Sequence, residues 1–194
     1  MSTTPTGTSP PAPVRLLLLV TGSVSAAFLP FHLVWLGQNH PEVQTTLVLT
    51  RAATRFVTAA ALTALAGTPV HLDDWSDFDP GAAPHVEWST GVDAAVVYPA
   101  TLDHLGRLAR GSADTPALLA LQLLTGPMVL APALPPGGLT SHAFTTATEL
   151  LRARPGVTVL DPVPGRSTST HGLDAYAPAP FPTAIAATLS ALRR

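Results

Sequence analysis

The feature that most constrains the fold of this chain is a regular alternation of short, predominantly apolar runs with longer stretches of helical pattern. The run from Val14 to Val20 is typical of a strand that is buried on both faces of a sheet. The segments predicted as strands are 14–20, 43–49, 70–72, 94–98, 128–131 and 157–160. The predicted helices lie at about 26–38, 52–65, from Thr101 onward, 116–124, 141–152 and 183–192. This alternation predicts a single α/β domain with a doubly wound parallel sheet, Rossmann-like or flavodoxin-like, in three layers.

A chain of 194 residues is long enough for one domain with a sizeable core. Residues 1–13 are mostly Ser, Thr, Pro and Gly and are predicted to be a disordered tail, so that the domain comprises residues 14–194. Residues from about 161 to 182 form a long segment rich in Pro, Gly, Ser and Thr. Because such long loops are usually lids or disordered, we expect this segment to be flexible.

The composition limits the classes of partner. Only 11% of the residues are charged and 46% are hydrophobic, which indicates that other subunits cover part of the surface. The formal net charge of −2 provides no basic surface for nucleic acid. No apolar run approaches the ~18 residues that a membrane-spanning helix needs. Residues 23–27 resemble a signal-peptide cleavage site, but residues 1–13 contain no basic residue, so we expect a soluble cytoplasmic protein.

Missing residue types and spacings exclude several kinds of site. The chain has no cysteine, which excludes disulfides, thiolate nucleophiles and cysteine-based metal sites. Its seven histidines show neither H-x-x-x-H nor H-E-x-x-H spacing, so no metal site is expected. The acidic stretch 73–79 does not match an EF-hand and is interpreted as a solvated loop. A serine hydrolase is disfavoured because the G-x-S-x-G elbow is absent.

Small and polar residues follow the predicted strands at the points where these end. In a doubly wound sheet, ligands bind beyond the carboxyl ends of the strands. The candidates there are the turn 22–25, Thr50, the turn 99–103 and the loop from Pro132. Gly22 permits a tight turn, and Ser23 and Ser25 offer hydroxyls beside the amides of a helix, which suits either a phosphate or an ordinary helix cap. The turn is neither a G-x-G-x-x-G fingerprint nor a P-loop.

The stretch 84–114 is the centre of the predicted site. It is expected to form a polar turn with His85, a buried strand that stops at Pro99, and a helix capped by Thr101. His85 is close enough in sequence to face the crevice as a general base or an orienting hydrogen bonder, although a surface or capping histidine is the alternative. Asp103 either favours the positive end of the helix dipole or binds a ligand.

Five stretches together resemble one family, the homo-oligomeric flavin-containing cysteine decarboxylases. Residues 20–26 (Val-Thr-Gly-Ser-Val-Ser-Ala) resemble its phosphate loop, and residues 49–57 resemble its second-strand segment, where a Ser or Thr and a Phe meet the flavin. Residues 84–89 (Pro-His-Val-Glu-Trp-Ser) resemble its His motif, and residues 93–101 lead into the start of its PASANT motif. Residues 111–114 resemble its G-x-A-D motif. Order and spacing agree from residue 14 to about residue 160.

The resemblance implies FMN as the cofactor and the peptide-acting branch of the family, whose members include lantibiotic and linaridin decarboxylases. The implied cofactor contacts are Gly22, Ser23, Ser25, Thr50, Phe56, Pro99, Ala100, Thr101, Asp103, Ala113 and Asp114. The implied substrate contacts are Pro132, Leu134 and Pro135, with the stretch around 165–174 clamping the peptide end. His85 would assist deprotonation or orient the reacting cysteine.

The implied reaction is the oxidative decarboxylation of the C-terminal cysteine of a ribosomal precursor peptide. Hydride leaves the cysteine Cβ for the flavin, and the resulting thioaldehyde is the electron sink for loss of CO2, which yields a peptidyl enethiolate. Such a product would serve the biosynthesis of aminovinyl-cysteine peptides. The resemblance also implies a homo-oligomer, a trimer or a dodecamer, with FMN between subunits.

Departures from the family pattern keep other interpretations open. The PASANT motif continues here as Leu102-Asp103-His104 instead of Ala-Asn-Thr, and the substrate motif PxMNxxMW keeps only Pro132. The phosphopantothenoylcysteine decarboxylase branch is understood to use a cysteine, which this chain lacks. A flavin prenyltransferase relative would need basic residues near the site, for which Arg51, Arg55 and Arg107 are the candidates. A non-catalytic homologue is the remaining alternative.

Overall fold

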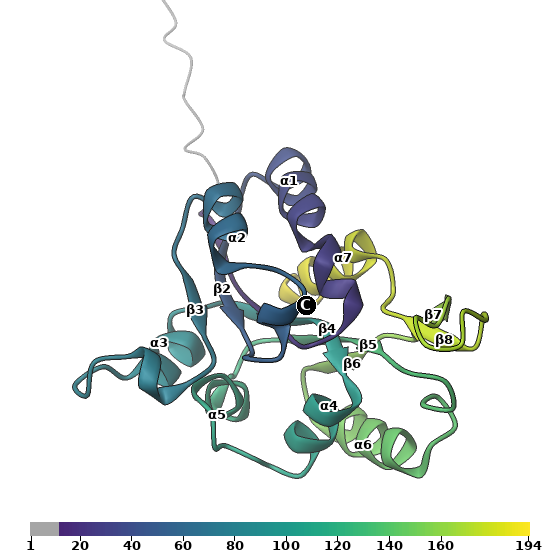
Figure 1. The fold of residues 1–194 in the computed structure, drawn as a ribbon. Helices are drawn as coiled ribbons and strands as arrows, with labels where there is room; N and C mark the ends of the chain where they lie inside the picture. Colours follow the sequence, from purple (N-terminus) through teal and green to yellow (C-terminus); the bar gives the residue numbers. More distant parts are fainter. Residues whose placement is uncertain (1–11) are drawn as a thin grey trace, which may run out of the picture.

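The computed structural model describes residues 12–194. Its centre is a parallel sheet with the strand order β3-β2-β1-β4-β5-β6 (Figure 1). The strands are β1 (Val14–Val20), β2 (Val43–Leu49), β3 (Val70–Leu72), β4 (Ala94–Thr101), β5 (Met128–Ala133) and β6 (Val157–Val159). This order and the parallel pairing of all neighbours confirm the predicted doubly wound sheet. The tail predicted for residues 1–13 lies outside the described residues, except for its last two positions.

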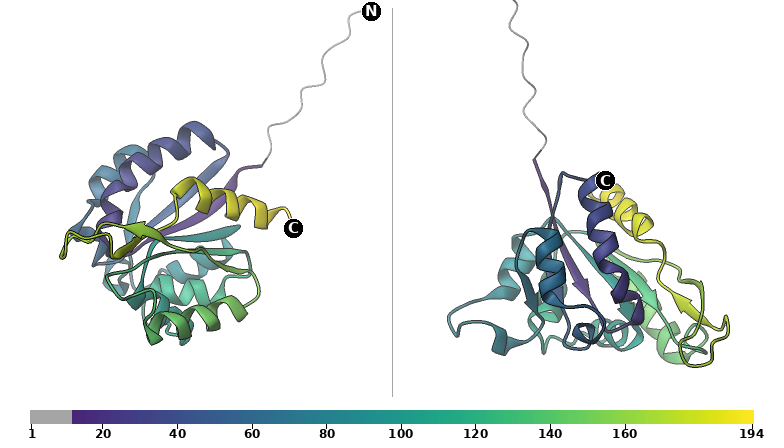
Figure 2. Two further views of the ribbon diagram at one scale, coloured as in Figure 1. Left: turned by 90° about the vertical axis from the view of Figure 1, so that its right-hand side faces the viewer. Right: turned by 45° about the horizontal axis from the view of Figure 1, so that its top comes forward.

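Helices cover both faces of the sheet (Figures 1 and 2). One face carries α1 (Leu29–Asn39), α2 (Ala59–Ala66) and α7 (Phe181–Leu192). The other carries α3 (Pro84–Thr90), α4 (Leu102–Ala109), α5 (Pro116–Leu123) and α6 (His142–Ala153). None of the helices in residues 12–194 is long and apolar enough to cross a membrane.

Strand β1 shows why the sequence contains unbroken apolar runs. Leu16 and Leu18 belong to the core cluster beneath α1, α2 and α7, whereas Leu17 and Leu19 belong to the cluster on the opposite face. Because successive side chains of a strand point to opposite faces, the buried part of this central strand, residues 16–20, is apolar at every position.

The helix starts agree with the prediction in part. The hydroxyl of Thr101 caps α4 as predicted, and that of Ser141 caps α6. Pro30 lies in the first turn of α1, where a proline removes no helical hydrogen bond. The helix predicted over 52–65 is a 3₁₀ turn (Ala53–Arg55) followed by α2, which is capped by Thr58.

Strand β4 does not stop at Pro99 as predicted. It continues to Thr101, through a cis Tyr98–Pro99 bond, with a shift in its register against β5 between Val97 and Ala100. A bulge of this kind leaves the nitrogen of a proline outside the ladder, so a strand can continue past it. The carboxyl end of β4 therefore extends further toward the crevice than the sequence suggested.

The segment 161–182 contains regular structure that the sequence did not predict. Strands β7 (Val163–Gly165) and β8 (Ala175–Ala177) pair antiparallel and form a small second sheet, so β6 is not the last strand. Tyr176 also exchanges two backbone hydrogen bonds of 2.9 Å with Leu134, which follows β5. The β7–β8 hairpin, residues 163–177, thus packs against the loop that follows β5.

Candidate functional site

The crevice of this fold lies where the strand order reverses, between β1 and β4. Buried hydrogen bonds join the two strand ends. Thr21 donates its amide (3.3 Å) and its hydroxyl (2.7 Å) to the carbonyl of Pro99, and the amide of Thr101 donates to the Thr21 hydroxyl at 2.9 Å. Because Thr21 is only 1% exposed, these bonds do not compete with water, and they fix the two loops relative to each other.

Gly22 allows the loop after β1 to pass close to the segment after β2. A Cβ atom at this position would lie 2.4 Å from the Cβ of Ala52 and 2.9 Å from its carbonyl carbon. No larger residue fits unless the backbone moves. The loop continues with Ser23, whose hydroxyl accepts a hydrogen bond from the amide of Ser25 at 3.3 Å.

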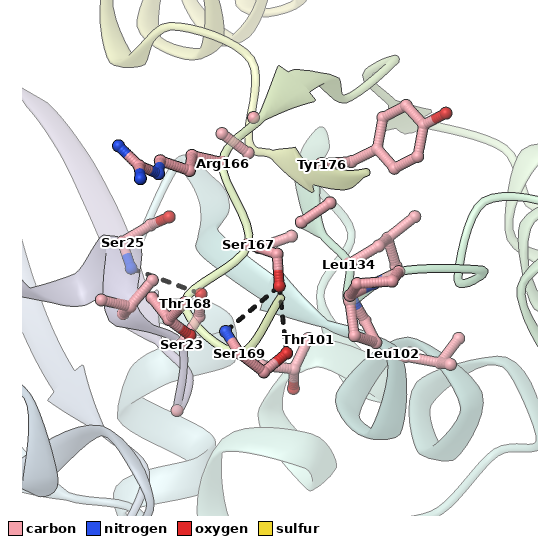
Figure 3. A pocket seen from close by; sticks show the side chains of 18 of the residues that line it. Ser23, Ser25, Thr101, Leu102, Leu134, Arg166, Ser167, Thr168, Ser169 and Tyr176 are labelled. Carbon is pink, nitrogen blue, oxygen red and sulfur yellow. Dashed lines mark hydrogen bonds between the residues drawn. The ribbon is translucent and has the colours of Figure 1, made fainter. Parts of the chain in front are cut away.

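A first cavity of about 420 Å³ opens beside this loop. Its walls come from five segments: the loop after β1, the segment after β2, the end of β4 with the first turn of α4, the loop after β5, and the β7–β8 hairpin. Figure 3 shows most of the lining side chains. Hydroxyl groups of Ser23, Ser25 and Thr101 line one part, and the apolar side chains of Phe56 and Leu134 line another. The cavity therefore combines hydrogen-bonding groups for a polar or anionic group with an apolar surface for a ring or a side chain.

The loop of the hairpin is organised by its own hydrogen bonds. The Ser167 hydroxyl, in a residue that is 3% exposed, accepts from the amides of Ser169 (3.2 Å) and Thr170 (3.1 Å). Ser167 also accepts from His171 at 3.1 Å and donates to Gly172 at 2.8 Å through its backbone. Figure 3 shows Ser167, Thr168 and Ser169 of this loop in the middle of the view, between Ser23 and Leu134.

A second cavity of about 440 Å³ adjoins the first, and both are lined by Gly22, Thr101 and Asp103. Its charged side chains are mostly paired. Arg51 forms an ion pair with Asp74, and Arg107 forms one with Asp114 at 2.7 Å. Arg107 also lies 4.0 Å from Asp103.

Burial shifts the pKa values of two groups that line the second cavity. The pKa of Asp73 is raised, chiefly because burial disfavours its charged form, although the Ala117 amide donates to it at 2.8 Å. Burial, with a smaller contribution from Arg107, lowers the pKa of His104 to about 4. His104 is 3% exposed, and its Nε2 has no hydrogen-bond partner within residues 12–194. His104 is therefore a neutral imidazole at physiological pH.

Most of the predicted contacts lie together in this cleft, by which we mean the two cavities combined. Those that line it are Gly22, Ser23, Ser25, Thr50, Phe56, Thr101, Asp103, Leu134 and Pro135. Those that do not are Pro99, Ala100, Ala113, Asp114 and Pro132. Pro99, Ala100 and Pro132 are buried in their strands, and Asp114 positions Arg107 from outside the cleft.

His85 lies away from the cleft of its own chain. It is in the first turn of α3 instead of the predicted polar turn, and its ring packs edge-on against Trp75 with 5.5 Å between ring centroids. The Trp75 indole in turn donates to the carbonyl of Asp114 at 2.8 Å. The His85 Nδ1 is buried and has no partner in the described part of the chain. A catalytic role for His85 stays a prediction.

Sequence reasoning missed Asp73. Asp73 directly follows β3, so the rule that placed Thr50 at the carboxyl end of β2 also applied to it. The family resemblance implied that the stretch around 165–174 clamps the peptide end, but it singled out no residue there, because the segment 161–182 has the composition of a loop. The hairpin contributes Arg166, Ser167, Thr168, Ser169 and Tyr176 to the first cavity.

Comparison with known proteins identifies the family of this chain. The family model described as Flavoprotein matches residues 8–178. The cypemycin cysteine dehydrogenase (decarboxylating) of a Streptomyces species is 38% identical over 138 residues, which are 71% of this chain and 71% of that protein. The crystal structure of the cypemycin decarboxylase CypD has a TM-score of 0.75 at 33% identity, covering 93% of this chain and 94% of that one. The FMN-dependent cysteine decarboxylase SpaF has a TM-score of 0.78 at 27% identity, covering 94% and 99%. The chain belongs to the Flavoprotein family.

Proposed function

We propose that this protein is an FMN-dependent enzyme that oxidatively decarboxylates the C-terminal cysteine of a ribosomal precursor peptide. The product is a peptidyl enethiolate of the kind used to build aminovinyl-cysteine rings. The observation that carries the proposal is the cleft between β1 and β4, in a chain that is similar over nearly its whole length to the cypemycin decarboxylase.

The residues of the cleft fit FMN. The loop that Gly22 brings close to the strand ends presents the hydroxyls of Ser23 and Ser25, which suit a phosphate. Phe56 and Thr50 offer an apolar surface and a hydroxyl for a heteroaromatic ring, in the two adjoining cavities. Two cavities of about 420 and 440 Å³ that share three residues give room for an elongated cofactor and for the end of a peptide.

Bound FMN supplies the hydride acceptor for oxidation of the cysteine Cβ–H bond. The protein holds and orients the reacting groups. Leu134, Pro135 and the β7–β8 hairpin enclose the peptide end and exclude water. Because the chain has no cysteine to supply a reducing thiol, the enethiolate is released without further reduction.

A homo-oligomer explains why His85 is not in the cleft of its own chain. We assign His85 of the partner subunit to the cleft, where it takes the thiol proton or orients the cysteine. Beside His85, Val86 and Trp75 are 44% and 43% exposed, and an apolar surface of this kind suits a subunit contact. The assembly is a trimer or a dodecamer, and it works in the cytoplasm, where the precursor peptide is made.

Mixed oligomers test this arrangement. Ser25→Asp places a carboxylate at the proposed phosphate site but retains His85, whereas His85→Asn retains the phosphate site. Each variant alone is expected to be inactive, and an assembly of both subunits is expected to recover part of the activity, because some clefts combine an intact loop with an intact histidine. If mixed assemblies stay as inactive as the single variants, His85 does not act across the interface.

The function is tested by spectroscopy and mass spectrometry on the purified protein. Flavin absorption bands are expected, together with loss of one CO2 and two hydrogen atoms from short synthetic peptides that end in cysteine. Peptides that end in serine or in cysteine amide are the controls and are expected to stay unchanged. Bound flavin without mass change in any peptide would favour a non-catalytic homologue, and failure to bind added FMN would overturn the proposal.

A further inference from the structure

The cleft contains one arginine that is not engaged by a carboxylate. Within residues 12–194, the arginines that line the two cavities are Arg51, Arg107 and Arg166. Arg51 is paired with Asp74 and Arg107 with Asp114. Arg166 makes no ion pair in the described part of the chain, and it is the one basic residue lining the first cavity. An arginine held beside a polar cavity without a counter-ion is suited to an anionic ligand.

The hairpin restricts where the guanidinium of Arg166 can lie. Its Nε donates to the carbonyl of His171 at 3.1 Å, across the loop. That loop is closed by the backbone bonds of Ser167 with His171 and Gly172. The Nε bond leaves the two terminal nitrogens of Arg166 available. A planar guanidinium with two parallel donors matches a phosphate or a carboxylate and can form two hydrogen bonds with it.

The position of Arg166 favours a ligand group bound at the loop after β1. In Figure 3, Arg166 is drawn on the same side of the cavity as Ser25 and Ser23, and Tyr176 and Leu134 are on the other side. Ser23 and Ser25 supply hydroxyls but no positive charge, and Asp103 adds a negative charge to the same cavity. Backbone amides and hydroxyls alone can bind a phosphate, but a cation beside Ser23 and Ser25 would strengthen that binding, and the hairpin carries one.

We propose that Arg166 binds the phosphate of FMN from the hairpin side, so that the β7–β8 hairpin is part of the cofactor site as well as a cover for the peptide. This proposal rests on the proposed binding of FMN. The carboxylate of the peptide C-terminus is the competing anion, and the experiment below distinguishes it from the phosphate.

Riboflavin, which lacks the phosphate, provides a direct test. The flavin-free full-length protein is titrated with FMN and with riboflavin, and flavin fluorescence reports the dissociation constants. Arg166→Gln is expected to weaken FMN binding about 10- to 100-fold, as for loss of charge-assisted hydrogen bonds. Riboflavin binding is expected to change less than about two-fold, because no interaction with the ring is removed. Higher salt should reduce the difference in dissociation constant between the wild type and Arg166→Gln for FMN but not for riboflavin.

Two further variants control for folding and charge. Arg152→Gln removes an exposed arginine of α6 that lines neither cavity and should leave both affinities unchanged. Arg166→Lys keeps the charge but loses the paired donors, so FMN affinity should fall between those of the wild type and Arg166→Gln. Circular dichroism melts of all variants verify the fold.

Several outcomes would overturn the proposal. An equal loss of FMN and riboflavin affinity in Arg166→Gln would show a purely structural role. Unchanged FMN affinity would also overturn it. If FMN affinity is unchanged while peptides with a free C-terminal carboxylate bind more weakly and their amides do not, Arg166 binds the substrate instead. If the wild-type protein binds neither FMN nor riboflavin, the proposed function itself is refuted. That result differs from the outcomes above, which concern only Arg166→Gln.

Discussion

The two sides of the cleft are built in different ways. The loops after β1 and β4 are bonded to each other and to the sheet through Thr21, beneath a surface that water does not reach. The hairpin is held by bonds within its own loop, by one pair of backbone bonds between Tyr176 and Leu134, and by the partly buried Tyr176 side chain, which packs against the core. The first side is thus built into the sheet, whereas the second is joined to it at few points. We therefore expect large global effects from substitutions on the first side and local effects from those on the second.

The largest effect is expected at Gly22. Gly22→Ala places a Cβ 2.4 Å from that of Ala52, so the loop or the segment after β2 must move. We expect a loss of about 3 kcal/mol in the free energy of unfolding, measured by urea denaturation, together with loss of FMN binding. Gly37→Ala is the matched control, because no atom lies within 4 Å of its added methyl group. As a helical glycine, Gly37 should gain about 0.5–1 kcal/mol from the same change.

A pH-dependent effect on the free energy of unfolding is expected at His104, a buried residue in the first turn of α4. Its pKa of about 4 lies below the value of 6.5 for an unperturbed histidine, so the unfolded state binds its proton more readily than the folded state. The contribution of His104 to the free energy of unfolding is therefore complete above about pH 6.5, and it is lost as the pH falls toward 4. We expect a loss of about 2–3 kcal/mol from His104 between pH 7.5 and pH 4.5.

His104→Leu removes this titration. Urea denaturation at both pH values should show a smaller acid-induced loss of stability in the variant than in the wild type, by the amount given above. Substitution of His142, which is exposed on α6, serves as the control and should leave the pH dependence unchanged. An equal acid-induced loss in His104→Leu and wild type would mean that other groups, not His104, govern stability in this pH range.

An intermediate effect is expected at Thr21. Thr21→Val keeps the shape but removes the hydroxyl that donates to Pro99 and accepts from Thr101, leaving a buried carbonyl and a buried amide with weaker partners. We expect a loss of about 2 kcal/mol in the free energy of unfolding and weaker FMN binding. Thr188→Val is the control, because the buried Thr188 hydroxyl bonds only to the Ala184 carbonyl within α7. A loss no larger than that of the control would show that the bonds of Thr21 do not hold the two loops.

The contrast between the two sides of the cleft also explains which features could be predicted from the sequence. Strand β2 was predicted with its observed bounds, because the Thr- and Val-rich run 43–49 is flanked by clear breaks. Most of the site formed by the strand ends was also predictable, since parallel strands bring their carboxyl ends to one edge of the sheet. Gly22 and Thr50 follow two of those ends, and Thr101 is the last residue of β4.

The failures arise where tertiary contacts override local preference. A bulge carries β4 past Pro99, and no local signal marks a bulge. His85 is near the site in sequence, but α3 places it against Trp75 outside the cleft. The hairpin residues 163–165 and 175–177 pair across a loop whose composition resembles a disordered segment, so their pairing depends on the contact with Leu134 that the sequence does not reveal.

The smallest effect on global stability is expected at Ser167, within the hairpin loop. Ser167→Ala removes the acceptor for the amides of Ser169 and Thr170, but these bonds connect residues of one loop and none of the sheet. We expect the free energy of unfolding to fall by less than about 1 kcal/mol, while hydrogen exchange at these two amides becomes faster. Ser169→Ala removes the 3.0 Å hydrogen bond between the two hydroxyls but keeps the Ser167 acceptor, so it should speed the exchange of these amides less than Ser167→Ala does. If Ser167→Ala instead destabilises the whole domain as much as Thr21→Val, the hairpin is part of the cooperative core, and the distinction between the two sides of the cleft fails.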